Sequence, residues 1–346
     1  MWPDRDDRPE LDILIAGCGT NQAAVFARGN PGARVVAIDV SQSSLDHERY
    51  LKDRHGLDNL ELRLLPIEEA PKLGRRFDLI VSTGVLHHLC DPAAGLKALG
   101  ACLKPDGVAA LMLYARYGRI GVELLQSLFA DMGLGQDERS VQIVRETLAS
   151  LPAAHPVRGY LQITTDLTSD AALVDTFLHG RARSYTVSDC LELVAHAGLA
   201  FQDWLFHAPY YPHDRAHGLG AAVATLSPAQ QWAAMERINT VNACHFFIVR
   251  RPDSPLPVID FGSDGALDYV PHWRMRCGLE GGRMVRPGWS FTPSAEQAAL
   301  AGAIDGKRTI REIAGSGDPG AATAVFRALW ELDFIAPEVS SAGTPR

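Results

Sequence analysis

The fold of this chain is decided by Ile13-Leu-Ile-Ala-Gly-Cys-Gly-Thr-Asn-Gln22 and by Val35-Val-Ala-Ile-Asp39, which follows it. The first stretch predicts an apolar strand over 12–16 that runs into a tight glycine turn and then a helix. The second predicts a strand over 35–39 that ends in an acid. Strand, glycine turn, helix, strand and acid in this order predict a βαβ unit that binds a nucleotide.

Each residue of the turn has an expected task. Gly17 and Gly19 let the backbone approach a ligand that a Cβ atom would exclude, and Cys18 lies between them. The helix that begins near Gln22 is expected to direct unpaired N–H groups at an anionic group. Asp39 is expected to accept hydrogen bonds from both ribose hydroxyls. The alternative is a structural turn and a solvated strand end.

Two further segments continue the pattern. Phe77 to Pro92 reads F-D-L-I-V-S-T-G-V-L-H-H-L-C-D-P and predicts a strand, a turn and a short helix. Leu99 to Gly107 reads L-G-A-C-L-K-P-D-G and leads into an apolar stretch. Alternation with helical stretches indicates a doubly wound sheet. The predicted strands lie near 12–16, 35–39, 61–65, 77–81, 108–114, 199–206 and 245–250.

Taken in order, G-C-G-T, the acid that ends the second strand, F-D-L-I-V, V-L-H-H-L-x-D-P and L-K-P-D-G resemble the class I methyltransferases. The resemblance is close over 11–114, loose to about Arg251 and absent beyond. It implies S-adenosylmethionine as the cofactor and a Rossmann-like α/β fold with a mainly parallel seven-stranded sheet whose last strand is antiparallel. The ligand crevice then lies at the carboxyl ends of the strands. Asn21 is a departure, because many relatives carry a third glycine there.

Gln22 argues against a nicotinamide-dependent reductase. In a dinucleotide site the third small residue of G-x-G-x-x-G lets the helix pack beside a pyrophosphate, whereas Gln22 is large and polar. Adenosylmethionine has no pyrophosphate and tolerates such a residue. The resemblance also implies contacts to the adenine ring and residues that border the cofactor after the fourth strand. The expected cofactor residues are Gly17, Cys18, Gly19, Asn21, Gln22, Asp39, Val40, Ile67, Glu68, Thr83 and Gly84.

The candidate catalytic residues are His88, His87 and Tyr114, any of which is a candidate general base. Adjacent helical residues do not face the same way, so at most one of the two histidines is expected to point into the crevice. A base is needed only if the acceptor arrives protonated. Catalysis by positioning alone is therefore the alternative.

The segment Tyr114-Ala-Arg-Tyr-Gly-Arg119 leaves the fifth strand beside the expected place of the methyl acceptor. Its aromatic and guanidinium groups suit a flat substrate and a carboxylate bound by two parallel hydrogen bonds. The alternative is that the arginines pair with acids such as Glu123 or Asp175. The expected substrate-binding residues are Arg116, Tyr117, Arg119 and Tyr185.

The linker from Pro252 to Pro257 divides the chain into a domain over 1–252, which the resemblance implies is the methyltransferase domain, and a small accessory domain over 253–346. Residues 115–182, with helical spacing over 120–129 and 141–148, are expected to form a helical lid on the crevice, and 207–244 a second insertion. The last region is similar to small winged-helix-like modules, with helices near 294–304, 309–313 and 322–332. Its nine Lys and Arg against twelve Asp and Glu argue against DNA. The roles that remain for this region are contact with another protein, a homodimer interface, or a cover for one flank of the sheet.

Charge, hydropathy and cysteine content exclude several classes of partner and site. The net charge of -8 argues against nucleic acid as a partner. No apolar run approaches a membrane span and the N-terminus lacks a signal peptide's apolar core, so we expect a cytoplasmic protein without membrane contact. The six cysteines are widely spread and predict thiols, and no ligand cluster predicts a metal.

These features favour methyl transfer from S-adenosylmethionine to a small anionic or aromatic acceptor, by in-line displacement at the sulfonium methyl group. One alternative is methylation of a protein or peptide side chain, with the C-terminal domain docking the partner. The other is a module that binds adenosylmethionine without catalysis.

Overall fold

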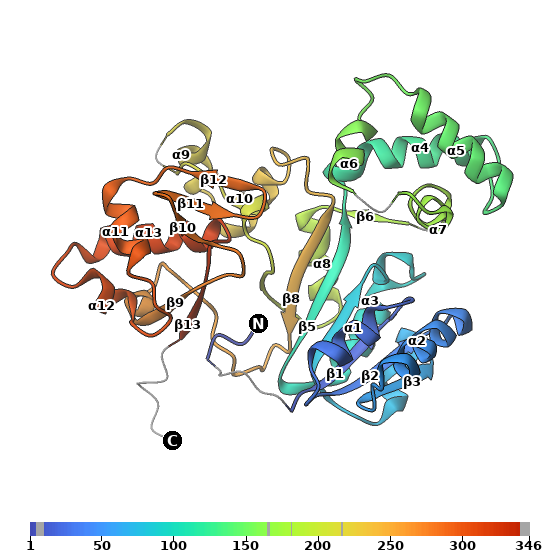
Figure 1. Ribbon diagram of the computed structural model, residues 1–346, viewed down its shortest axis with the longest axis horizontal. Coiled ribbons are helices and arrows are strands. Elements are labelled where there is room, and N and C mark those ends of the chain that lie inside the picture. The colour runs from blue at the N-terminus through green and yellow to red at the C-terminus, as the bar shows by residue number, and fades with distance from the viewer. Residues whose placement is uncertain (5–9, 165–166, 181, 216, 340–346) are drawn as a thin grey trace.

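A twisted sheet of eight strands forms the centre of the molecule (Figure 1). The computed structural model describes residues 1–4, 10–164, 167–180, 182–215 and 217–339. The strands are β1 (Asp12–Ala16), β2 (Arg34–Asp39), β3 (Leu60–Leu64), β4 (Phe77–Thr83), β5 (Leu103–Ala115), β6 (Ser184–Tyr185), β7 (Ala200–Trp204) and β8 (Cys244–Arg250).

Seven of these strands follow the order β3-β2-β1-β4-β5-β8-β7, and the two-residue β6 pairs with β5 outside this path. The pairs from β3 to β5 are parallel, whereas β8 runs antiparallel to both β5 and β7. This confirms the predicted seven-stranded, mainly parallel sheet with an antiparallel last strand. The carboxyl ends of β1, β2, β4 and β5 therefore meet at one edge.

Helices cover both faces because successive strand residues point to opposite sides. Ile13 and its neighbours pack against two helices on one face, and Leu14 packs against two others on the opposite face. Residues of both faces are apolar, as a buried parallel sheet requires. The first pair is α1 (Gln22–Gly29) and α2 (Gln42–His55), and the second is α3 (Pro92–Ala101) and α8 (Val187–His196).

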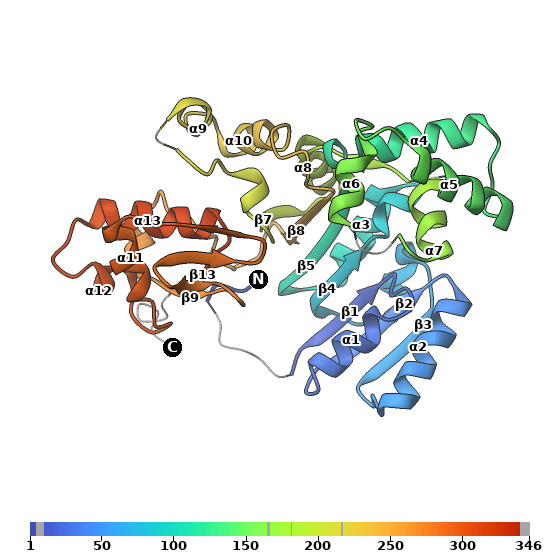
Figure 2. The ribbon, with the colours of Figure 1, turned by 45° about the horizontal axis from the view of Figure 1, so that its top comes forward.

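The segment between β5 and β6 is helical, as predicted, and lies over the carboxyl ends of the strands (Figure 2). It has its own apolar core, which includes Val122, Phe129 and Phe177. We call this segment the lid. Its elements are η3 (Tyr117–Arg119), α4 (Ile120–Asp131), α5 (Glu138–Ser150), α6 (Val157–Ile163), α7 (Asp170–Leu173) and the π-helical turn η4 (Val174–Leu178).

The C-terminal unit contains the predicted helices and also two small antiparallel sheets that the sequence did not indicate. The helices are α11 (Ala295–Gly302), α12 (Ile310–Ala314) and α13 (Pro319–Glu331). The sheets pair β10 (Gly278–Glu280), β11 (Arg283–Arg286) and β12 (Trp289–Phe291), and β9 (Tyr269–Trp273) with β13 (Ile335–Val339). The strands are short, and β13 pairs with a segment far away in the chain.

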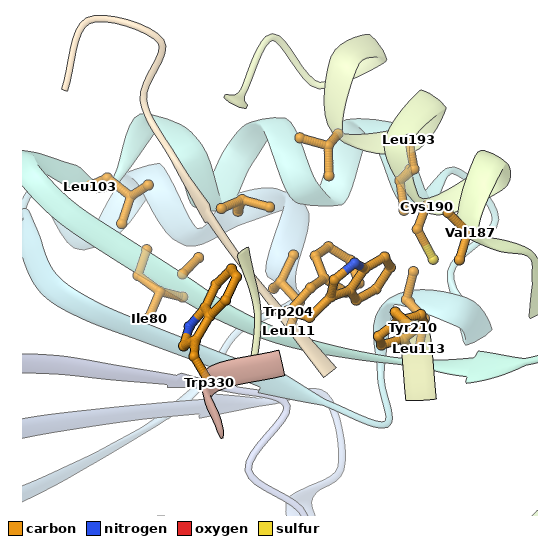
Figure 3. Packing of buried hydrophobic residues seen from close by; sticks show 14 of the residues in the cluster. Ile80, Leu103, Leu111, Leu113, Val187, Cys190, Leu193, Trp204, Tyr210 and Trp330 are labelled. Atoms are coloured by element: carbon orange, nitrogen blue, oxygen red, sulfur yellow. The ribbon is translucent and has the colours of Figure 1, made fainter. Parts of the chain in front are cut away.

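The apolar cluster on one face of the main sheet continues into this unit (Figure 3). Trp204 at the end of β7 stacks on Tyr210 with ring centroids 3.8 Å apart, and Trp330 of α13 belongs to the same cluster. Arg215 adds an ion pair of 2.6 Å to the buried Glu331. Arg215 lies in the second insertion, which also holds η5 (Ala208–Tyr210), α9 (Gly218–Ala224) and α10 (Pro228–Met235).

Within the described part of the chain, no helix is long and apolar enough to cross a membrane.

Candidate functional site

The glycine turn after β1 needs glycine for its backbone and for its close packing. Gly17 and Gly19 have φ of 79° and 57°, in the left-handed region that other residues rarely adopt. A Cβ atom on Gly17 would lie 2.3 Å from a methyl group of Val85. The Gly17 and Cys18 amides donate to the Ile38 carbonyl at 2.9 and 3.2 Å, which fixes the turn beside β2.

Asp39 ends β2 next to this turn. Its Oδ2 atom accepts from the Gly19 amide at 3.0 Å and its Oδ1 atom from the Ser41 amide at 2.8 Å. These two bonds orient the carboxylate, and each oxygen keeps a further lone pair for a ligand. Asp39 is thus a fixed hydrogen-bond acceptor at the carboxyl edge of the sheet.

The backbone amides in the first turn of α1 bind a side chain that the sequence analysis did not predict for this site. Glu48 of α2 is fully buried and accepts from the Ala23 and Ala24 amides at 2.9 and 3.0 Å. Burial raises the pKa of Glu48, and the two backbone bonds act in the opposite direction. The prediction that unpaired N–H groups here face an anionic ligand is therefore wrong for Ala23 and Ala24.

Glu48 escaped detection because it lies in the polar run Asp46-His-Glu-Arg49, which is typical of a solvated helix face. One signal was present. Glu48 follows the buried Leu45 by three residues, and residues three apart share a helix face. A carboxylate on the buried face of α2 needs donors, and the adjacent N-terminus of α1 supplies them.

The other predicted cofactor residues surround the same edge of the sheet. The Gln22 side-chain amide donates to the Thr83 hydroxyl at 2.5 Å and so joins α1 to the end of β4. Gly84, after β4, has a φ of 78°. In the 3-10 helix η1 (Ile67–Leu73), Ile67 is buried and its neighbour Glu68 is exposed; Asn21 and Val40 are also exposed.

Tyr114, at the end of β5, is the centre of a group that has a buried core of Tyr114, His87 and Arg119 and an exposed carboxylate, Asp175. We call this group the Tyr114 cluster: His87, His88, Tyr114, Arg119, Tyr160, Asp175 and His179. The His87 ring stacks on Tyr114 with centroids 3.9 Å apart. The Arg119 guanidinium carbon lies 3.6 Å from the Tyr114 centroid, and the Tyr114 hydroxyl donates to Asp175 Oδ2 at 3.2 Å. Burial and the Asp175 carboxylate raise the pKa of Tyr114, so this phenol stays protonated at neutral pH.

His87 and His88 lie in the 3-10 helix η2 (Leu86–His88). Their rings do not point apart: the ring centroids are 4.2 Å from each other. His87 is 1% exposed, and neither of its ring nitrogens has a hydrogen-bond partner. Burial lowers the pKa of His87 to about 2. Burial and the neighbouring His179 lower the pKa of His88 to about 4. Both rings are neutral at neutral pH.

Arg119 is almost fully buried, with 2% of its surface exposed. Its Nη1 donates to the Tyr160 hydroxyl of α6 at 3.1 Å, whereas its Nη2 is buried without a hydrogen-bond partner. Among the residues that the structure describes, no carboxylate forms an ion pair with it, so the alternative of pairing with Glu123 or Asp175 is not observed. Arg119 is a buried cation stacked on aromatic rings.

The remaining predicted substrate residues lie outside the Tyr114 cluster or at its border. Arg116 is exposed and lies 3.5 Å from Asp189 at the start of α8. Tyr185 is 1% exposed within the main apolar core, so it cannot touch a substrate without opening that core. Tyr117 begins the short η3 helix and is partly exposed.

Two lid residues of the Tyr114 cluster, Tyr160 and His179, were not singled out from the sequence. They lie about 45 and 65 residues beyond Tyr114 in the chain, a separation at which side-chain pairing leaves no periodic trace. No group of three or more His, Cys, Asp or Glu residues that could hold a metal ion occurs within the described ranges.

Comparisons with known proteins relate the chain to methyltransferases. Residues 14–109 match a family model described as a methyltransferase domain. An uncharacterized protein from a Synechococcus strain is 30% identical over 280 residues, which are 77% of this chain and 66% of the relative. A malonyl-[acyl-carrier protein] O-methyltransferase from Acetivibrio thermocellus is 34% identical over 112 residues, which are 32% of this chain and 38% of that enzyme.

Among solved structures, PKMT2 from Rickettsia typhi superimposes with a TM-score of 0.66 at 16% identity, over 97% of this chain and 73% of that one. The same protein in complex with AdoHcy gives a TM-score of 0.65. The shared fold thus extends through the C-terminal unit. The chain spans slightly less than two thirds of the Synechococcus relative and about two fifths of the O-methyltransferase.

Proposed function

The chain belongs to the class I S-adenosylmethionine-dependent methyltransferases, and from this premise we propose that it transfers the sulfonium methyl group to a small-molecule acceptor. The observation that carries the proposal is that the Gly17 turn, Asp39 and the Tyr114 cluster lie along one edge of the sheet, under the lid. Methyl transfer needs nucleophile, methyl carbon and sulfur in line, and a site that excludes water. An edge of the sheet that is covered by a lid suits both needs.

The cofactor half of the site is assigned to the carboxyl ends of β1, β2 and β4. Asp39 is already oriented by two backbone amides and receives the ribose hydroxyls. Gly17 is assigned to the methionine end of the cofactor. A side chain at this position would clash with Val85 and displace the turn. We assign to the same half Gln22, Thr83 and Gly84, of which Gln22 and Thr83 are joined by a hydrogen bond.

The acceptor half is assigned to the Tyr114 cluster. Arg119 supports an anionic acceptor, because a buried guanidinium without a carboxylate partner gains most from an anion. The stacked faces of Tyr114 and His87 suit a flat acceptor. His88 is assigned as the general base, since it is more exposed than His87 and is neutral at neutral pH.

A polypeptide acceptor is the second candidate, and the outer face of α4 favours it. Ile120, Leu124, Leu128 and Met132 recur every four residues on this helix and are all exposed. A contiguous apolar stripe of this kind is typical of a surface that contacts another molecule.

Methyl-labelled adenosylmethionine, incubated with the protein and a cell extract separated by mass, tests the proposal. We expect label to enter a small anionic compound in the low-mass fraction and to be absent with a heat-inactivated control. Label in the protein fraction would establish the second candidate instead. Binding of adenosylhomocysteine without label transfer in any fraction would leave a non-catalytic module and overturn the proposal.

For the cofactor, we predict that Asp39→Ala weakens adenosylmethionine and adenosylhomocysteine alike by about 1.5–3 kcal/mol, the range for loss of a charged hydrogen-bond acceptor. Isothermal calorimetry measures this, with Asp53→Ala on the exposed side of α2 as the charge-matched control. NADH is expected not to bind. An unchanged affinity in Asp39→Ala, or tight NADH binding, would refute the assignment.

A further inference from the structure

One carboxylate of the lid reaches two groups of the sheet edge. Asp175 lies in the π-helical turn η4, where the Thr176 carbonyl accepts from the Gln126 side chain of α4 at 2.7 Å. Asp175 Oδ2 accepts from the Tyr114 hydroxyl at 3.2 Å, and Oδ1 lies 3.9 Å from His88 Nε2. Asp175 therefore faces both candidate catalytic groups, and its separation from His88 is that of an ion pair, longer than a direct hydrogen bond.

The two nitrogens of His88 have different surroundings. Nε2 faces Asp175, whereas Nδ1 is buried and has no hydrogen-bond partner. A carboxylate accepts hydrogen bonds and cannot donate one when ionised, so it selects the tautomer with the proton on Nε2. That tautomer leaves an unprotonated lone pair on Nδ1, an atom that is buried without a hydrogen-bond partner.

We propose that Asp175 is a positioning residue that holds neutral His88 with its proton on Nε2 and so presents Nδ1 as the base. The part about the base rests on the proposed function; the part about the tautomer does not. When the acceptor bonds to the methyl carbon, the carbon–sulfur bond breaks to give the thioether, and the acceptor's proton passes to Nδ1. The resulting imidazolium is stabilised by the Asp175 carboxylate until the proton leaves to solvent.

Among the described groups that lie near His88, Asp175 supplies the carboxylate. His87 and His179 lie with ring centroids 4.2 and 4.0 Å away, and Arg119 acts on His88 as a positive charge. Tyr114 approaches edge-on with its hydroxyl committed to Asp175. Asp175 belongs to the lid and His88 to the sheet edge, so this pair joins the two parts of the site.

The tautomer is tested without any substrate. Long-range proton–nitrogen NMR spectra of histidine-labelled protein, with His88 assigned by its absence in His88→Gln, distinguish the two tautomers at neutral pH. We expect the Nε2–H form in the wild type and its loss in Asp175→Asn. Asp170→Asn is the matched control, because Asp170 lies in the same lid but pairs with Arg145. The Nδ1–H form in the wild type, or no change in Asp175→Asn, would overturn the proposal.

The second test measures the rate of label transfer from labelled adenosylmethionine to the low-mass fraction of the extract. Asp175→Asn is expected to lower the rate of label transfer at least tenfold, with adenosylhomocysteine affinity within about threefold of wild type. Combining it with His88→Gln should cost no more than His88→Gln alone, since both changes disable one unit. Additive losses would mean that Asp175 acts elsewhere. A wild type that transfers no label while showing the Nε2–H form would refute the proposed function but not the tautomer.

Discussion

Replacing His88 with glutamine is expected to lower kcat by about two orders of magnitude or more, the contribution usual for a positioned general base. Glutamine keeps the size and polarity of the side chain but cannot take up a proton. Adenosylhomocysteine affinity should not change, because His88 lies in the Tyr114 cluster and the cofactor residues lie on β1, β2 and β4. Steady-state turnover with saturating acceptor measures the loss, and His196→Gln on the exposed end of α8 is the control.

The pH profile gives the same residue a second signature. Burial and His179 lower the pKa of His88 to about 4, so the ring is an unprotonated base above that value and a protonated non-base below it. The wild-type kcat/KM should therefore be flat near neutrality and fall as the pH drops through about 4. His88→Gln should lack that fall. Circular dichroism at each pH separates titration from unfolding. A variant that keeps both kcat and the acid limb would mean that the enzyme works by positioning alone.

Local pattern was sufficient to predict the strands β1 to β5 and the helices between them, and the family resemblance implied the antiparallel last strand. Residues such as Leu14 and Ile15 are apolar on both sides of a strand, which only a parallel sheet buried on both faces accommodates. The start of α8 is also set locally, because the Thr186 hydroxyl accepts from the Asp189 amide in a capping box. The glycine turn and Asp39 belong to the same class of short-range signal.

Contacts between distant segments were not predictable. Glu48 on α2 accepts a hydrogen bond from Ala23 on α1. Asp175 accepts one from Tyr114 only because the lid folds back over β5. Neither pairing changes the periodicity of the segment that carries it. The strands β9 and β13 were missed for the same reason, since each is completed by a partner more than sixty residues away. Sequence therefore located the sheet edge, and packing decided which side chains meet there.

This distinction separates the two arginines that the sequence could not rank. Arg116 is exposed beside Asp189, whereas Arg119 is buried with a free Nη2 and its guanidinium flat on Tyr114. Lysine has a single ammonium group and cannot hold Tyr160 and an anion with a planar fork. We therefore expect Arg119→Lys to raise the KM for the acceptor by roughly tenfold to a hundredfold, with kcat less affected.

Arg116→Lys is the matched control, because it makes the same chemical change a few residues away at an exposed site. Its acceptor KM and its adenosylmethionine affinity should stay within about twofold of wild type, as exposed ion pairs contribute little. Adenosylmethionine affinity should also survive in Arg119→Lys. A rise in KM in both variants would place the anion between the two arginines. No rise in either would mean that the unpaired charge of Arg119 serves the closed lid and that the acceptor carries no anionic group, because a buried cation that bound one could not lose its fork without cost.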